Sequence, residues 1–352
     1  MCGCGWLYSV PLGPRISRRE AIERTRFNGK LAGKCLAGEL RREGRTVNIS
    51  PLRGVASFIA LSVALAIQAS AALAADQSKP GVFVHSYEND SGANCDVIWN
   101  DMKKALAEQG WTGPLIDLSY YVNDAGCGSS INQDGSHSTH YASGHSDGGH
   151  TTGTNIRHLG YHLAWWIYDH YGKSGQCIEA VGHSMGGLII RYAIAQVDNG
   201  NPDFPPSICV EDVVTLGTPH AGTPWAWGCS SLQCVQMRGN VLCDGASASA
   251  FIQWLRAYAW DPDGVGGSQW TLLGSQADLT VPSNCALRNM AAYGRTKYLL
   301  SSGVSHAEYI HLTSENDTAD VSYKRGSSDW TTDYTSPWPV KWSRLALSET
   351  TW

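Results

Sequence analysis

The stretch CIEAVGHSMGG, residues 177–187, decides the fold, because a short apolar run passes through a glycine-rich turn into a helical pattern that ends near Val197. In the nucleophile elbow G-x-S-x-G, glycines two positions before and after the serine leave room for a strained turn that lifts the hydroxyl above a sheet. We therefore predict a strand over 177–181, a helix over 185–197 and a nucleophile at Ser184.

A second stretch, GHSDG at 144–148, fits the same pattern around Ser146. So short a pattern arises by chance in a chain rich in glycine and serine. Ser146 has no apolar strand before it and no amphipathic helix after it, whereas the helix after Ser184 would aim its positive N-terminus at the nucleophile. We therefore assign the nucleophile to Ser184.

The rest of the chain alternates between apolar runs and helical patterns. We predict further strands over 81–85, 115–122, 210–216, 270–274 and 297–300, and further helices over 96–111 and 156–172. This alternation predicts an α/β fold, with parallel βαβ units and a sheet covered on both faces. Residues 124–153 are rich in Gly, Ser, Asp and His, which predicts a long surface loop.

A serine hydroxyl needs a base to remove its proton, and the base needs a carboxylate to hold its tautomer. After an elbow of this kind the acid comes first and the histidine second, each just beyond a strand. Asp278 follows the strand over 270–274, and His306 follows the strand over 297–300. We therefore predict that Ser184, Asp278 and His306 form a catalytic triad.

Other acids and histidines compete for these roles. Asp261 and Asp263 have no strand directly before them, and His311 falls inside a new apolar run where a packed histidine is expected. His183 and His220 lie beside the predicted site, and we expect structural hydrogen bonds from both.

These motifs together resemble secreted bacterial lipases and esterases of the α/β-hydrolase fold, over roughly residues 80–312. The resemblance rests on GHSMGG at 182–187, on VVTLGTPHAGT at 213–223 and on the segment 274–282 around Asp278. It implies a mostly parallel central sheet with helices on both faces, and hydrolysis of carboxylic esters through an acyl-enzyme without a cofactor.

The resemblance also implies two donors for an oxyanion hole, the backbone N–H groups of Met185 and Tyr87. Such lipases usually have His-Gly two residues before the second donor, whereas this chain has His85-Ser86. The local backbone at Tyr87 therefore departs from the common pattern.

An aromatic-rich excursion over 223–270 follows the Thr-Pro-His-Ala-Gly turn and would lie over the site. Its side chains could line an acyl groove or meet a lipid surface. We select Trp225, Trp227, Phe251 and Trp254 as substrate-binding candidates. The alternative is that these aromatics pack a disulfide-bound subdomain.

Histidines and aspartates of the polar loop could be interpreted as a metal site. They are His137, His140, His145, His150, Asp134 and Asp147. A metal site needs a rigid frame that fixes ligand geometry, and the sequence offers no helix or strand there. We therefore expect a solvated loop and assign no metal.

The charge of the 352-residue chain divides at residue 75. Residues 1–75 hold 11 Lys/Arg and 4 Asp/Glu, and residues 76–352 hold 15 and 27. A nucleic-acid partner needs clustered cations, so the acidic main body argues against DNA or RNA. We expect an ester or lipid as the partner, and the sequence sets no oligomeric state.

Residues 54–75 form a long apolar run with Arg53 before it and Ala-Leu-Ala near its end. This pattern predicts a cleaved secretory signal peptide, with an uncleaved membrane anchor as the alternative. The basic leader 1–53 is interpreted either as a gene-start artefact or as an unusually long n-region. The remaining residues, 76–352, would form one extracellular catalytic domain.

Eight of the 11 cysteines follow residue 75. An even number of cysteines in an exported chain predicts disulfide bonds, while the connectivity stays open.

The sequence therefore predicts a secreted serine hydrolase that cleaves carboxylic esters as a lipase or an esterase. A serine peptidase or an acyltransferase on the same scaffold is one alternative. A non-catalytic polymer- or surface-binding protein is another, although binding alone would not require a triad in the right order.

Overall fold

The computed structural model describes residues 77–89, 92–131, 150–244, 247–259, 262–287 and 292–348. Every described residue belongs to one compact unit, 66–352. The expected leader, signal peptide and Ser146 lie outside the described residues, as do Asp261 and the loop residues 134–147. Within the described ranges, no helix has both the length and the apolar character to span a bilayer.

The described strands form a nine-stranded sheet in the order β3-β2-β1-β4-β5-β6-β7-β8-β9. The strands are β1 Gly81–Val84, β2 Leu115–Ser119, β3 Ser129–Ser130, β4 Ile178–His183, β5 Val210–Leu216, β6 Gln269–Ser275, β7 Gly294–Tyr298, β8 Ala319–Arg325 and β9 Thr331–Ser336. All pairings from β3 to β7 are parallel, and only β8 and β9 join antiparallel at the edge. The sheet confirms the predicted α/β-hydrolase fold.

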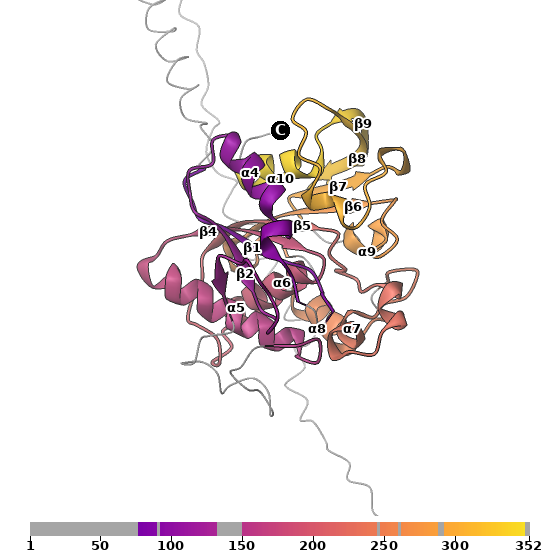
Figure 1. Cartoon of the computed structure of the whole chain (residues 1–352). Helices are drawn as coiled ribbons and strands as arrows, with labels where there is room; N and C mark the ends of the chain where they lie inside the picture. Colours follow the sequence, from indigo (N-terminus) through magenta and orange to yellow (C-terminus); the bar gives the residue numbers. More distant parts are fainter. Residues whose placement is uncertain are drawn as a thin grey trace, which may run out of the picture. The chain divides into compact units, whose positions relative to one another are not determined.

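Helices cover both faces of this sheet (Figure 1). One side holds α3 Cys95–Ile98, α4 Asn100–Glu108 and α10 Pro339–Leu347, and the other holds α5 Ile156–His170, α6 Met185–Asp198 and α8 Ala250–Ala259. Alternate residues of β1 feed two separate cores, because Val82 and Val84 pack on the α5 side and Phe83 packs on the α4 side. This period of two is what a strand buried on both faces requires.

The remaining helical elements are short. They are α7 Leu232–Met237, α9 Ser283–Leu287 and the 3₁₀ turns Gly172–Ser174, Pro224–Gly228, Val265–Gly267, Leu300–Ser302 and Glu308–Ile310.

Several elements differ from the sequence prediction. The helix expected over 96–111 breaks at Trp99 into α3 and α4, and the loop expected over 124–153 contains the short strand β3. The strand expected over 297–300 lies over 294–298 as β7. Its sequence GRTKY is too polar to be recognised as a strand. The polar residues are accommodated because Arg295 donates to the Gly326 carbonyl and Lys297 lies over the Trp330 ring.

The eight cysteines after residue 75 form four disulfides, as predicted. The pairs are Cys95–Cys127, Cys177–Cys209, Cys229–Cys234 and Cys243–Cys285. The second pair joins the chain just before β4 to the chain just before β5. The last pair ties the aromatic-rich excursion to α9, close to the segment that carries Asp278.

Candidate active site

Ser184 occupies the sharp turn between β4 and α6, with φ 52° and ψ −122°. This backbone region is costly for any residue with a side chain, and such strain persists only where the surroundings enforce it. A Cβ on Gly186 would lie 2.1 Å from the Val84 carbonyl oxygen, and one on Gly182 would lie 2.5 Å from the Gly187 Cα. The glycines of the motif are therefore required by close backbone approach, as the sequence pattern predicted.

Asp278 and His306 are joined by a hydrogen bond. The Asp278 carboxylate follows β6, is 2% exposed, and its Oδ2 lies 2.8 Å from His306 Nδ1. Its Oδ1 accepts from the backbone N–H groups of Thr280 at 2.9 Å and Val281 at 2.8 Å. The carboxylate is thus held in one orientation, and a hydrogen on His306 Nδ1 leaves Nε2 able to accept a proton.

Gly217, which follows β5, leaves the space in which this pair meets. Its φ is +57°, and a Cβ there would lie 3.1 Å from Asp278 Oδ2 and 3.2 Å from His306 Nδ1. A Cβ would also lie 2.8 Å from Tyr309 Cε2. Gly217 is a position where both the backbone conformation and the neighbouring side chains exclude a larger residue.

His183, the last residue of β4, holds the backbone of His306 in place. Burial, followed by the nearby His306, lowers the pKa of His183 to about 3, so the ring is neutral at ordinary pH. Its Nε2 lies 2.8 Å from the His306 carbonyl oxygen, which can only accept, so His183 donates this bond. The bond positions the backbone of His306.

His220 is likewise buried within the structure. Burial, and then the charge of Arg191, lowers the pKa of His220 well below its ordinary value. Its Nε2 lies 3.0 Å from Thr215 Oγ1.

The turn after β1, residues 85–87, contains the predicted oxyanion donor Tyr87. The His85 ring stacks on Tyr120 at 3.9 Å between ring centroids, and the Tyr120 hydroxyl lies 2.8 Å from the His85 carbonyl oxygen and 2.6 Å from that of Ser86. Two carbonyls of the turn are therefore held by one tyrosine. Ser86 stands where the resembling lipases usually have glycine, and its hydroxyl donates to Glu88 Oε1 at 2.7 Å.

Asp124 organises the other side of this turn. Its Oδ2 lies 3.0 Å from His85 Nε2 and accepts from the backbone N–H groups of Tyr120 and Tyr121, each at 2.8 Å. Burial alone would raise the pKa of Asp124, but the bond and charge of His85 together with backbone donors lower it below its ordinary value. The sequence pattern assigned no role to Tyr120, which lies inside the strand predicted over 115–122, or to Asp124, which follows that predicted strand by two residues.

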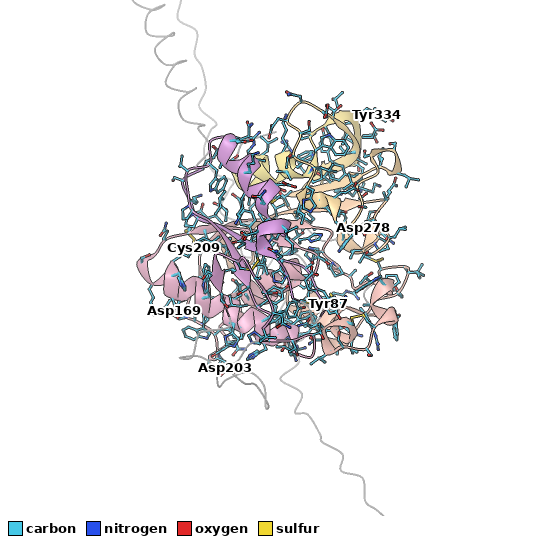
Figure 2. The ribbon with its side chains drawn as sticks, in the orientation of Figure 1. Tyr87, Asp169, Asp203, Cys209, Asp278 and Tyr334 are labelled. Carbon is cyan, nitrogen blue, oxygen red and sulfur yellow. A yellow bond between two sulfur atoms is a disulfide. The ribbon has the colours of Figure 1, made fainter. Side chains whose placement is uncertain are left out.

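One cavity of about 220 Å³ joins these parts. Its lining residues are Ser86, Tyr87, Glu88, Asn89, Ser184, Pro219, Thr223, Trp225, Met237, Thr280, Val281 and His306. Tyr87 follows β1 and Asp278 follows β6, so the site is built from both halves of the sheet (Figure 2). A larger hollow of about 380 Å³ is lined by Arg295, Lys297 and Lys324 and holds none of the predicted triad.

The substrate-binding candidates lie in different environments. Trp225 lines the cavity, and its ring meets Tyr87 edge-on at 6.0 Å. Trp227 is 62% exposed and lies under the Arg238 guanidinium, while Phe251 is buried in the core. Trp254 packs at the core margin on α8. Of the four candidates, only Trp225 is among the cavity-lining residues described.

The described rivals for the triad lie elsewhere. Asp263 Oδ1 accepts from the backbone N–H of Trp270, and so caps the beginning of β6. His311 Nδ1 lies 2.8 Å from Asp101 Oδ2 on α4. Neither residue lines the cavity described around Ser184.

Residues 110–239, which include Ser184, match the family model described as "Putative serine esterase (DUF676)". No curated protein matches the chain. The matched residues hold the nucleophile elbow, and the match supports an ester hydrolase.

Several solved structures are similar to parts of the chain. The mature form of Bacillus licheniformis lipase BlEst2 shares 18% identity with a TM-score of 0.35, over 57% of this chain and 67% of that chain. Phospholipase PlaB from Legionella pneumophila shares 16% identity with a TM-score of 0.34, over 56% of this chain and 37% of that chain. Aspergillus fumigatus lipase B shares 13% identity with a TM-score of 0.41, over 66% of this chain and 49% of that chain. The chain thus spans 37% to 67% of the length of these three proteins.

Proposed function

We propose that this protein is a serine hydrolase that cleaves carboxylic esters through an acyl-enzyme, with Ser184, His306 and Asp278 as its triad. The observation that supports it best is that the strained Ser184 and the Asp278-bound His306 line one cavity. A strained serine and an oriented histidine that face the same space are the two parts that nucleophilic acyl transfer needs.

In the proposed reaction, Ser184 Oγ attacks the ester carbonyl carbon while His306 Nε2 takes the hydroxyl proton. The carbonyl oxygen becomes an oxyanion and accepts hydrogen bonds from the N–H groups of Met185 and Tyr87. The C–O bond to the alcohol then breaks, and His306 gives its proton to the departing oxygen. Water, deprotonated by His306, attacks the acyl-enzyme carbonyl carbon. The bond to Ser184 Oγ then breaks, His306 returns the proton to Oγ, and the acid leaves.

The size of the cavity favours short acyl chains. Its volume of about 220 Å³ lies below the range of about 300–1,000 Å³ that is usual for small-molecule sites. Glu88 and Asn89 add polar groups to its lining, and Trp225 adds an apolar one. We therefore propose an esterase rather than a long-chain lipase.

We further propose that the signal peptide 54–75 directs export and that residues 76–352 work outside the cell as the catalytic domain. The four disulfides support this proposal, because structural disulfides persist in oxidising compartments. Sequencing the N-terminus of protein recovered from the culture medium tests it, and a mature chain that still carries the apolar run would refute cleavage.

The decisive experiment measures hydrolysis of p-nitrophenyl esters from acetate to palmitate by the wild type, Ser184→Ala and Ser146→Ala. We expect Ser184→Ala to abolish the enzymatic rate, Ser146→Ala to leave it unchanged, and kcat/KM of the wild type to be highest for short chains. Activity that survives Ser184→Ala would refute the triad. A preference for palmitate would refute the proposed substrate size.

A further inference from the structure

Three histidines converge inside the protein, away from the cavity of Ser184. His150, His158 and His162 are each 1% exposed, and their potential ligand atoms all lie within 4.8 Å of one another. The Nε2 atoms of His158 and His162 are 2.9 Å apart. The His150 ring centroid lies 5.1 Å from each of the other two ring centroids. We call these three residues the histidine cluster.

A rigid helix presents two members of the histidine cluster. His158 and His162 are one turn apart on α5, so both rings project from one face. The Asn155 side chain caps the first turn of α5, accepting from the Arg157 N–H at 2.9 Å. Gly160, between the two histidines, lets α5 approach α6 closely, because a Cβ there would lie 2.8 Å from Tyr192 Cδ1. The spacing of these two ligands is therefore set by packed secondary structure.

The third member comes from the chain before α5. His150 forms a parallel bridge with Tyr121, and its backbone carbonyl accepts from the Val122 N–H at 2.9 Å. Its Nδ1 lies 3.0 Å from the Tyr120 carbonyl oxygen. Since a carbonyl only accepts, Nδ1 carries the hydrogen and Nε2 keeps its lone pair. Metal-binding histidines commonly donate their second ring nitrogen in this way.

The distance between the two α5 histidines is close to what a transition-metal ion requires. Zinc–nitrogen bonds of about 2.0–2.1 Å in a tetrahedral site place two ligand nitrogens about 3.3 Å apart. The Nε2 atoms of His158 and His162, at 2.9 Å, need to separate by only a few tenths of an ångström to bind one ion. Neutral imidazole nitrogens suit Zn²⁺ and its neighbours rather than Mg²⁺ or Ca²⁺, which prefer oxygen.

We propose that His150, His158 and His162 bind one divalent transition-metal ion through three imidazole nitrogens, with Zn²⁺ the best fit. The ion would join α5 to the chain around Tyr120 and Tyr121. Tyr120 in turn holds the carbonyls of His85 and Ser86 in the turn that contains the predicted oxyanion donor. The site therefore braces the catalytic face without contacting substrate, and it is independent of the ester proposed above.

The test uses tag-free protein, because a histidine tag would bind zinc itself. The wild type is dialysed against micromolar ZnCl₂, then against buffer, and its zinc is counted by elemental analysis before and after dipicolinic acid. We expect about one zinc per chain, a lower Tm after chelation and recovery of Tm when zinc returns. The proposal would be overturned if the wild type retained no zinc and its Tm did not change when chelator was added.

Two variants and one control locate the ion. His158→Gln and His162→Gln should lose the bound zinc and the response of Tm to chelator. His170→Gln is the matched control, since His170 lies on the same helix but bonds the Trp166 carbonyl instead. Equal zinc content in all three variants would overturn the assignment.

If His158→Gln and His162→Gln do not fold, crystals of the wild type measured at the zinc absorption edge decide the question. An anomalous peak between the three rings supports the proposal, and a peak elsewhere or none refutes it.

Discussion

Replacing Asp278 by Asn tests the proposed mechanism most directly, because the structure fixes how the new amide must sit. Asp278 Oδ1 accepts from two backbone N–H groups, those of Thr280 and Val281. The amide oxygen of Asn will take that position, since the opposite orientation would lose both bonds, each worth about 0.5–1.5 kcal/mol, and press an NH₂ group against two donors. The NH₂ group therefore faces His306 Nδ1, which lies 2.8 Å from Oδ2 in the native pair.

A donor at this position selects the wrong form of the imidazole. His306 can accept from the NH₂ group only if Nδ1 is unprotonated, which places the hydrogen on Nε2. That nitrogen then cannot take the proton of Ser184. The corresponding change in serine proteases lowers kcat roughly 10⁴-fold, so we expect a loss of roughly 10³- to 10⁴-fold here, equal to about 4–5.5 kcal/mol in the barrier.

The assay is the steady-state hydrolysis of p-nitrophenyl acetate and butyrate, with kcat and KM determined separately. We expect kcat to fall while KM changes little, because the substituted atom does not line the cavity. Asp263→Asn is the matched control, since Asp263 is the rival acid and caps β6 instead. A kcat of Asp278→Asn within tenfold of the wild type, or an equal loss in Asp263→Asn, would refute the reasoning.

Two further changes probe the space around the pair and a buried carboxyl. Gly217→Ala should lower kcat at least tenfold, because its Cβ would lie 3.1 Å from Asp278 Oδ2. Gly175→Ala is the control, since Gly175 has a similar positive φ but open space around it. This control should cost only about 1–3 kcal/mol of stability and leave kcat unchanged. Burial, then the Asp212 carboxylate, raises the pKa of Glu179 from 4.5 to about 8. The folded state thus binds more protons than the unfolded state between these values, so this group's contribution to stability is lost as the pH rises through that window. Between pH 5 and 8, the free energy of unfolding measured in urea should fall less for Glu179→Gln than for the wild type. Identical slopes of this free energy against pH would contradict the prediction.

Local patterns predicted the central strands and the elbow well. The strand expected over 210–216 coincides with β5, and the helix expected over 185–197 differs from α6 by one residue at its end. Both segments are almost entirely buried, and a regular strand or helix satisfies the backbone groups of such a segment. The polar strand β7 and the edge hairpin of β8 and β9 were missed or displaced, because neighbouring strands rather than local composition stabilise them.

Part of the candidate site could be predicted from the sequence in the same way. Asp278 and His306 each follow a strand, and the structure joins them by a hydrogen bond. The aromatic candidates were harder to place, since their spacing does not say which face of α8 points to the core. Phe251 and Trp254 proved to pack there, and Trp225 lines the cavity.

The sequence by itself determined the strand, turn and helix around Ser184, because two glycines and an apolar run leave the backbone few other conformations. It also predicted the chain order Ser184, Asp278 and His306 for the proposed triad. Only the tertiary structure decided which cysteines pair, which aromatics reach the cavity, and that His150 meets two histidines of α5. Those contacts join segments that are distant in the sequence and meet only because of how the sheet and helices pack. Sequence periodicity reports which residues of one element share a face, and it does not report which distant segments meet.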